Sequence, residues 1–178
     1  MLTAEATAII HAIGYEGVSI ERFLSRLCEE KIEMVIDVRA NPISRKPGFS
    51  KTPLRTRLRL NGIKYEHFPK LGIPSYVRKQ YDDIYELLDY YDSKILTLPA
   101  TYDLAREVAD ICYTYNSVIL CFEKDPKLCH RSRLARYIAN EFGLSTDFIT
   151  YERQHEFVSI RYTKDLLPKE KQPTLFAF

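Results

Sequence analysis

Ser-Val-Ile-Leu-Cys-Phe, at residues 117–122, is the stretch that decides the fold class. It is a short and mainly apolar run, and we predict that it forms a central strand of a sheet. The residues before it, 102–115, and those after the next loop, 129–142, have patterns typical of helices, and Gly143 stands where the second helix should end. A strand between two helices favours an α/β domain with a mainly parallel sheet.

Strands and helices alternate along the rest of the chain. Apolar runs predict strands at 8–15, 34–38, 65–68 and 148–151, and periodic patterns predict helices from the N-cap Ser19 to about residue 31, at 54–60 and at 76–91. Proline and glycine indicate a loop at 41–52. We therefore expect one α/β domain over 1–160, with the sheet flanked by helices, and a separate tail over 161–178.

Length and composition exclude several classes of protein. The chain has 178 residues, of which 46% are hydrophobic and 28% are charged, which excludes a mostly disordered chain, a collagen and a coiled coil. No apolar run reaches the length of about 18 residues that a membrane span needs. The first residues lack the pattern of a secretory signal. We expect a cytoplasmic protein with reduced cysteines, nucleoid-associated if it is archaeal, and no membrane partner.

The net charge of +2 hides a strong asymmetry. Between Arg39 and Lys79 the chain has eleven Lys or Arg and one acid, Glu66, so this basic segment carries +10 and the rest carries −8. Polyanions are the usual partners of such a segment, although a solvated face that binds nothing is the alternative. We expect DNA as the partner. Candidate phosphate or nucleic-acid contacts in the segment are Arg45, Lys51, Arg55, Arg59 and His67.

Polar clusters follow three predicted strands, at 14–16, 37–39 and 123–125. Ligands of parallel sheets bind at the carboxyl ends of strands, so we expect a site there. Asp37 lies in an otherwise apolar strand, and Arg39 points to the same face. Two interpretations remain open for them: a structural ion pair, or catalytic residues in which the carboxylate is a general base or stabilises a cationic transition state.

A cysteine and several cations open the predicted helix at 129–142. Cys129, at the helix N-terminus near Arg131 and Arg133, is expected to have a lowered thiol pKa and is a candidate nucleophile. Alternatively, His130, Arg131 and Arg133 bind an anion there while Cys129 is merely packed. Zinc bound by Cys121, Cys129 and His130 is a third possibility, but structural zinc favours cysteine pairs two to four residues apart. We expect no metal and no other cofactor.

Five ordered motifs resemble the domain-of-unknown-function 488 family over roughly residues 8–150. They are Ile13-Gly14-Tyr15-Glu16-Gly17; Asp37-Val38-Arg39 with Pro42 and Ser44-Arg45; Tyr65 with His67; Leu71-Gly72; and Cys121-x-Glu123-Lys124-Asp125-Pro126 with Cys129-His130-Arg131-Ser132. The resemblance implies a small α/β domain with a site built from these motifs, and it supplies no settled activity. The chain departs from the family at Gly72-Ile73, where the family usually has two glycines.

The end of the chain resembles the peptide by which replication and repair proteins bind the sliding clamp, proliferating cell nuclear antigen (PCNA). Gln172, Leu175 and Phe178 occupy its glutamine, aliphatic and aromatic positions, and their spacing suits a single 3₁₀ turn that fills an apolar pocket. The second of the two adjacent aromatics is missing, so a lower affinity is expected. The alternative is an apolar tail that packs on its own domain.

Together these features favour a DNA-processing or repair enzyme. A DNA glycosylase fits best: a flipped base would be contacted by tyrosines and cleaved with help from Asp37. Two alternatives remain open, a non-catalytic nucleic-acid-binding adaptor and a small-molecule thiol enzyme that uses Cys129.

Overall fold

The computed structural model of the protein describes residues 8–152, and the strands of this part of the chain form one parallel sheet. The strand order is β3-β2-β4-β1-β5, and every neighbouring pair is parallel. The strands are β1 (Ile9–Gly14), β2 (Met34–Asp37), β3 (Lys64–His67), β4 (Ser117–Cys121) and β5 (Ser145–Phe148). All five residues of β4 are buried, which confirms 117–122 as the central strand.

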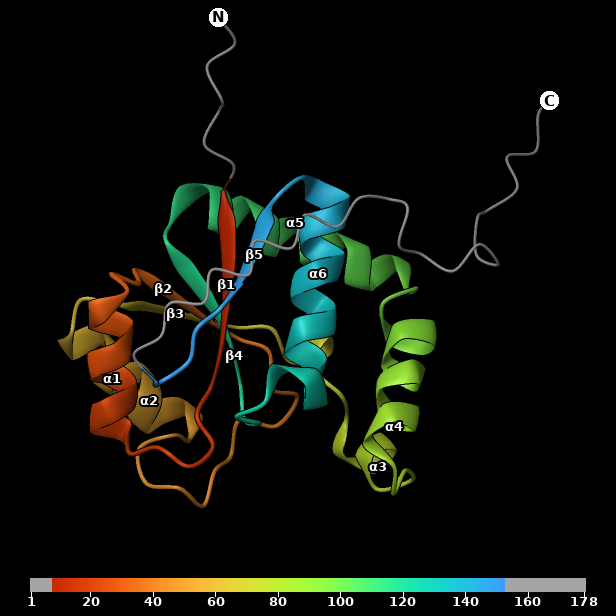
Figure 1. Cartoon of the computed structure of the whole chain (residues 1–178), viewed down its shortest axis with the longest axis horizontal. Coiled ribbons are helices and arrows are strands. Elements are labelled where there is room, and N and C mark those ends of the chain that lie inside the picture. The colour runs from red at the N-terminus through yellow and green to blue at the C-terminus, as the bar shows by residue number, and fades with distance from the viewer. Residues whose placement is uncertain (1–7, 153–178) are drawn as a thin grey trace, which may run out of the picture.

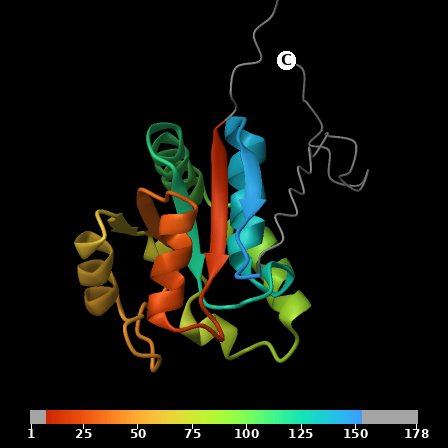
Figure 2. The same ribbon diagram turned by 60° about the vertical axis from the view of Figure 1, so that its left-hand side comes forward.

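Helices cover both faces of the sheet. The α-helices of the described residues are α1 (Ile20–Glu29), α2 (Lys51–Leu60), α3 (Ser75–Arg78), α4 (Ile84–Tyr90), α5 (Pro99–Thr114) and α6 (His130–Phe142). The short turns are η1 (Pro69–Leu71), η3 (Pro126–Leu128) and the π-helical η2 (Tyr91–Ile95). Figures 1 and 2 show α1 and α2 on one side of the sheet and α5 and α6 on the other. The predicted single-domain α/β fold is confirmed.

No helix of residues 8–152 combines the length and the apolar character that crossing a bilayer would need.

The two faces of the sheet bury alternate residues of the same strands. On β4, Ile119 packs with the α4, α5 and α6 side chains, whereas Val118 and Leu120 pack with those of α1 and α2. Successive side chains of a strand point to opposite faces, so a strand covered on both sides is apolar throughout. Each buried aliphatic side chain contributes about 1.5–3 kcal/mol.

Local signals set several helix ends where they were expected. The Ser19 hydroxyl accepts a hydrogen bond from the Arg22 amide at 3.2 Å and begins α1. Gly143 ends α6 with a φ of 76°, a left-handed conformation that glycine adopts without strain. Two helices begin about three residues before their predicted starts, α2 at Lys51 and α5 at Pro99.

The helix predicted at 76–91 is wrong, because the chain divides it. Helix α3 ends at Arg78, and a new helix, α4, begins after Asp83. The Asp83 carboxylate accepts hydrogen bonds from the amides of Tyr85 and Glu86, at 2.7 and 3.0 Å, and therefore acts as a new N-cap.

The strand predicted at 148–151 is also wrong, since β5 covers Ser145–Phe148. Among residues 8–152 it is an edge strand that pairs only with β1, and none of its four residues is fully buried. An edge strand of this kind needs no continuous apolar run, so the apolar residues that suggested a strand lie at and beyond its end.

The chain reverses its winding at β4, and this positions a crevice. Helix α1 follows β1 on one face of the sheet, and α6 follows the neighbouring β4 on the other face. The loops that leave the two strands therefore diverge. Such a switch point at the carboxyl edge is where open parallel sheets bind ligands.

Candidate functional site

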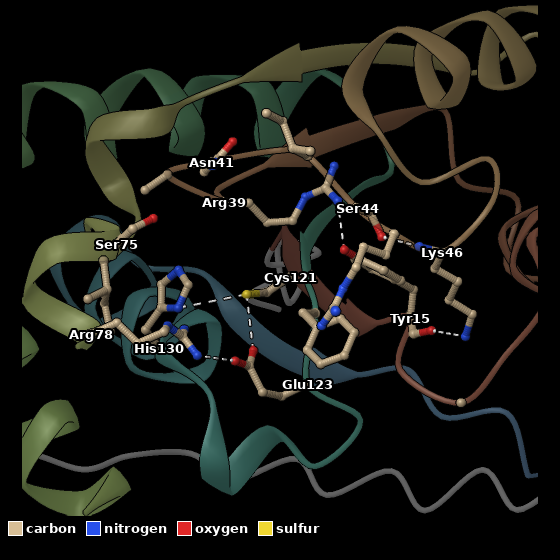
Figure 3. A pocket seen from close by; sticks show the side chains of 16 residues that line it. Tyr15, Arg39, Asn41, Ser44, Lys46, Ser75, Arg78, Cys121, Glu123 and His130 are labelled. Carbon is tan, nitrogen blue, oxygen red and sulfur yellow. Dashed lines mark hydrogen bonds and ion pairs between the residues drawn. The ribbon is translucent and has the colours of Figure 1, made fainter. Parts of the chain in front are cut away.

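A cavity of about 470 Å³ opens at the carboxyl edge of the sheet, where β1, β2 and β4 end. The lining side chains come from four stretches of the chain that follow these strands or approach them. They include Tyr15, Arg39, Asn41, Ser44, Arg45, Lys46, Ser75, Arg78, Cys121, Phe122, Glu123 and His130. Figure 3 shows Arg39 and Lys46 on one side of the cavity, and Arg78, His130 and Glu123 on the other.

The basic segment builds much of the cavity wall. The loop after β2 contributes Arg39, Arg45 and Lys46, and α3 contributes Arg78. The Lys46 ammonium donates a hydrogen bond to the main-chain oxygen of Tyr15 at 3.0 Å, which ties this loop to the end of β1. The sequence singled out Arg39 and Arg45 here, but it gave Lys46 and Arg78 no role beyond their charge.

Asp37 and Arg39 form a buried ion pair at the base of the cavity. Arg39 Nε donates to Asp37 Oδ1 at 2.8 Å, and Arg39 Nη2 lies 2.5 Å from Asp37 Oδ2. The Tyr65 hydroxyl donates to Asp37 Oδ2 at 2.6 Å. Burial alone would lower the pKa of Arg39, but its hydrogen bonds and charge interaction with Asp37 outweigh burial and raise that pKa.

Asp37 itself does not line the cavity. Its side chain has no exposed surface, and its oxygens are occupied by Arg39 and Tyr65. Arg39 also donates to the Tyr15 hydroxyl at 2.9 Å and to the main-chain oxygen of Phe49 at 2.8 Å. The structure therefore shows the ion pair, in which Asp37 orients the guanidinium that faces the cavity.

Glu123 is the carboxylate that faces the cavity. Its Oε1 accepts a hydrogen bond from Arg78 at 3.0 Å, and its Oε2 accepts from the thiols of Cys129 and Cys121, at 2.9 and 3.2 Å. Burial raises the pKa of Glu123, but the Cys129 hydrogen bond and the Arg78 charge outweigh it and lower the pKa to about 2. The sequence placed Glu123 at a strand end, and that position was the signal that could have added it to the site.

The lowered pKa expected for the Cys129 thiol is corrected by the structure. Cys129 is the N-cap of α6, but its side chain is only 1% exposed. Burial, followed by the neighbouring Cys121, raises the pKa of the Cys129 thiol well above its ordinary value. A buried protonated thiol is a poor nucleophile, so this environment disfavours the thiol-enzyme interpretation.

Arg131 and Arg133 do not line the cavity, although an anion pocket was expected around them. The Arg131 guanidinium is buried and donates to the main-chain oxygens of Glu123 and Lys124, at 2.6 and 3.1 Å. Arg133 pairs with Asp92 at 2.8 Å. Of the basic residues predicted in this motif, only His130 reaches the cavity. Arg131 instead fixes the loop that carries Glu123.

The remaining predicted contacts lie outside the cavity. Arg55 and Arg59 are exposed on α2. Lys51 contacts His67 Nδ1 at 3.0 Å, and His67 Nε2 lies 2.9 Å from the main-chain oxygen of Arg39. Gln172, Leu175 and Phe178 fall outside the described residues, as does the rest of the predicted clamp-binding tail.

The environments of the cysteines predict their reactivity. Cys28 is exposed, whereas Cys112, Cys121 and Cys129 are buried, and burial raises the pKa of Cys112 to about 11. We expect a chromogenic disulfide reagent to label one thiol rapidly in the native protein and all four after unfolding. In the Cys28→Ser variant the rapid phase should vanish. Rapid labelling of Cys129 in the native protein would restore it as a nucleophile.

Cys121, Cys129 and His130 come together beside Glu123, although the spacing of the two cysteines did not suggest it. Their sulfur and nitrogen atoms all lie within 4.8 Å of one another. They are the residues of the described chain that could hold a soft metal ion.

Comparison with known proteins gives one match. Neither the curated proteins nor the solved structures contain a match to the chain. The family model described as domain of unknown function DUF488 matches residues 19–138, which include β2, β4, the basic segment and the first residues of α6. Because this match spans about two thirds of the 178 residues, the chain belongs to the DUF488 family.

Proposed function

We propose that the protein is a DNA-processing enzyme that accepts one nucleotide unit of a DNA strand in the cavity and releases its base by hydrolysis. The observation that carries the proposal is the origin of the cavity wall. Four basic residues of the +10 segment line a space of about 470 Å³: Arg39 and Arg78 are paired with Asp37 and Glu123, and Arg45 and Lys46 supply the further positive charge. Clustered cations of this kind bind phosphates, and a cavity of this size suits a single extruded nucleotide.

The cavity offers separate contacts for the phosphate and for the base. Arg45 can hold a phosphate through two parallel hydrogen bonds, and Lys46 adds a point charge beside it. Phe122 is 42% exposed at the cavity and packs edge-on against Tyr15 at a centroid distance of 5.3 Å. Exposed aromatic rings stack on bases of any sequence. Arg55 and Arg59, exposed on α2, would contact flanking phosphates.

Glu123 replaces Asp37 as the carboxylate proposed for the chemistry. It faces the cavity and pairs with Arg78 at 3.0 Å, and a carboxylate in this position suits stabilisation of the positive charge that develops on the sugar as the base leaves. Arg39, fixed by Asp37, would orient the substrate. The sliding-clamp partner is a separate part of the proposal, and its support is the sequence of Gln172, Leu175 and Phe178 alone.

The test combines binding and turnover. We expect DNA affinity to fall steeply as salt rises, and the double change Arg55→Ala and Arg59→Ala to reduce the log–log slope by about 0.9 for each lost duplex contact. Arg106→Ala is the matched control, since Arg106 is exposed on α5 and lies outside the basic segment. Glu123→Gln should keep DNA binding and lower base release from lesion-bearing oligonucleotides by about 100-fold.

Two results would overturn parts of this proposal. Absence of DNA binding at low salt removes DNA as the partner. Tight binding without base release or strand cleavage on lesion-bearing oligonucleotides leaves the protein as a nucleic-acid-binding adaptor.

A further inference from the structure

Cys121, Cys129 and His130 form a compact cluster that the proposed chemistry does not use. Cys121 ends β4, Cys129 is the N-cap of α6 and His130 is the first residue of that helix. All three side chains are buried, with exposures of 2%, 1% and 3%. Turn η3 folds the chain between the two cysteines so that their sulfurs and the imidazole nitrogen lie within 4.8 Å of one another.

The orientation of His130 leaves one ring nitrogen for a ligand. His130 Nε2 lies 3.3 Å from the main-chain oxygen of Val38, and a carbonyl oxygen only accepts hydrogen bonds. The Nε2 atom therefore carries a ring proton toward Val38, and Nδ1 is the ring nitrogen on the side of Cys121. Metal-binding histidines are typically held in this way, with the second nitrogen bonded to a carbonyl or carboxylate.

The spacing of the donor atoms suits a tetrahedral ion. His130 Nδ1 lies 3.7 Å from Cys121 Sγ. Figure 3 shows the two side chains pointing toward one another. Zinc bonds of about 2.3 Å to sulfur and about 2.0 Å to nitrogen place a sulfur and a nitrogen ligand of a tetrahedral ion roughly 3.5 Å apart, and two sulfur ligands roughly 3.8 Å apart. Two sulfurs and one imidazole nitrogen are also donors that bind zinc, whereas magnesium and calcium bind oxygen donors.

The charges around the cluster balance those of a divalent cation. On binding, both thiols would release their protons to solvent, which leaves two thiolates against the two charges of the ion. The Glu123 carboxylate is matched by Arg78, which lies 3.0 Å from its Oε1. Cys121, His130 and Glu123 also line the cavity, so the fourth position of such an ion would face it.

We infer that Cys121, Cys129 and His130 bind one zinc ion, with a fourth coordination position at the cavity beside Glu123. Three protein ligands with one open position are the arrangement of zinc sites that bind water or substrate, whereas structural sites have four protein ligands. This inference does not rest on the proposed function, since it concerns metal binding alone.

The test measures metal on the whole chain under reducing conditions. We expect protein purified from zinc-supplemented medium to contain about one zinc per chain, and cobalt added to the metal-free protein to give the visible bands of a tetrahedral site with thiolate charge-transfer absorption. Chelator competition should show that Cys121→Ser and Cys129→Ser weaken zinc by more than the roughly 10–100-fold that outer-shell changes cost. Cys28→Ser, at an exposed position, is the matched control and should bind as the parent does.

Several outcomes would overturn the inference. Folded parent protein that binds neither zinc nor cobalt contradicts it, and so does a Cys121→Ser variant with unchanged zinc affinity. Another such outcome is metal-free protein that contains a disulfide between Cys121 and Cys129. If the protein still binds no zinc after that disulfide is reduced, the cluster serves thiol chemistry. If a serine variant does not fold, the cobalt spectrum of the parent protein still shows whether thiolates bind the ion in a tetrahedral site.

Discussion

Replacement of Asp37 by Asn is expected to lower the free energy of unfolding by about 3–5 kcal/mol, because it leaves the Arg39 guanidinium buried without its counter-charge. Arg39 is 6% exposed and donates three hydrogen bonds to Asp37, two from its side chain and one from its amide. In a chain of this size the loss corresponds to a fall in Tm of roughly 10 °C. Denaturant titration followed by circular dichroism measures it.

Tyr65→Phe is the matched control for Asp37→Asn. It removes one hydrogen bond to the same carboxylate, at 2.6 Å, and keeps the ion pair. The expected loss is smaller, roughly 2 kcal/mol. Equal stability of the parent and Asp37→Asn would show that the pair is not structural, and a loss of turnover without a loss of stability would return Asp37 to a catalytic role.

Gly14→Ala is expected to destabilise the protein by about 3 kcal/mol or more and to distort the cavity. A Cβ atom at Gly14 would overlap the main-chain oxygen of Glu123 and lie 3.2 Å from Arg131 Nη1. That oxygen belongs to the loop that carries Glu123, and Arg131 holds it at 2.6 Å. Backbone atoms cannot move aside as the end of a flexible side chain does, so the steric overlap lowers the stability of the fold directly. DNA affinity and stability should fall together.

Gly62→Ala separates this steric effect from the cost of losing a glycine. Gly62 follows α2, where an added Cβ meets no atom within 4 Å. Its φ of 74° is the only penalty, and the left-handed conformation costs an L-residue about 1–2 kcal/mol. If Gly14→Ala were no more costly than Gly62→Ala, the close approach of β1 to the Glu123 loop would not matter.

The sequence predicted the parts of the fold that are buried on both sides. The runs at 34–38 and 117–122 are mainly apolar because helices cover both faces of the sheet, and a short run of this kind indicates a strand. The predictions of a strand at 148–151 and of one helix at 76–91 were wrong, because the sequence signals for β5 and for the break at Asp83 are weak or local. Half-exposed Ser145–Phe148 has no apolar run, and one carboxylate decides where α4 begins.

The two-residue separation of Asp37 and Arg39 also indicated that their side chains point to the same face and can pair. This relation is local and depends on no other part of the chain. The surroundings of Cys129 could not be predicted in this way. A helix N-terminus near arginines suggested a reactive thiol, but Arg131 turns to two main-chain oxygens and the thiol is buried. The approach of Cys121 to Cys129 depends on the loop between them, which their separation in sequence does not reveal.

The position of β1 between β4 and β5 has a consequence for biosynthesis. β1 is made first, yet its partners are β4, from Ser117 onward, and β5, from Ser145 onward. At roughly 5–20 residues per second, a ribosome needs on the order of 10 seconds to make the chain between them. During that time the apolar segment Ile9–Gly14 has both edges unpaired, which is the condition under which chaperones bind nascent chains. The pair β2 and β3 can form early, whereas the cavity is completed only after Cys121, Glu123 and His130 have been made.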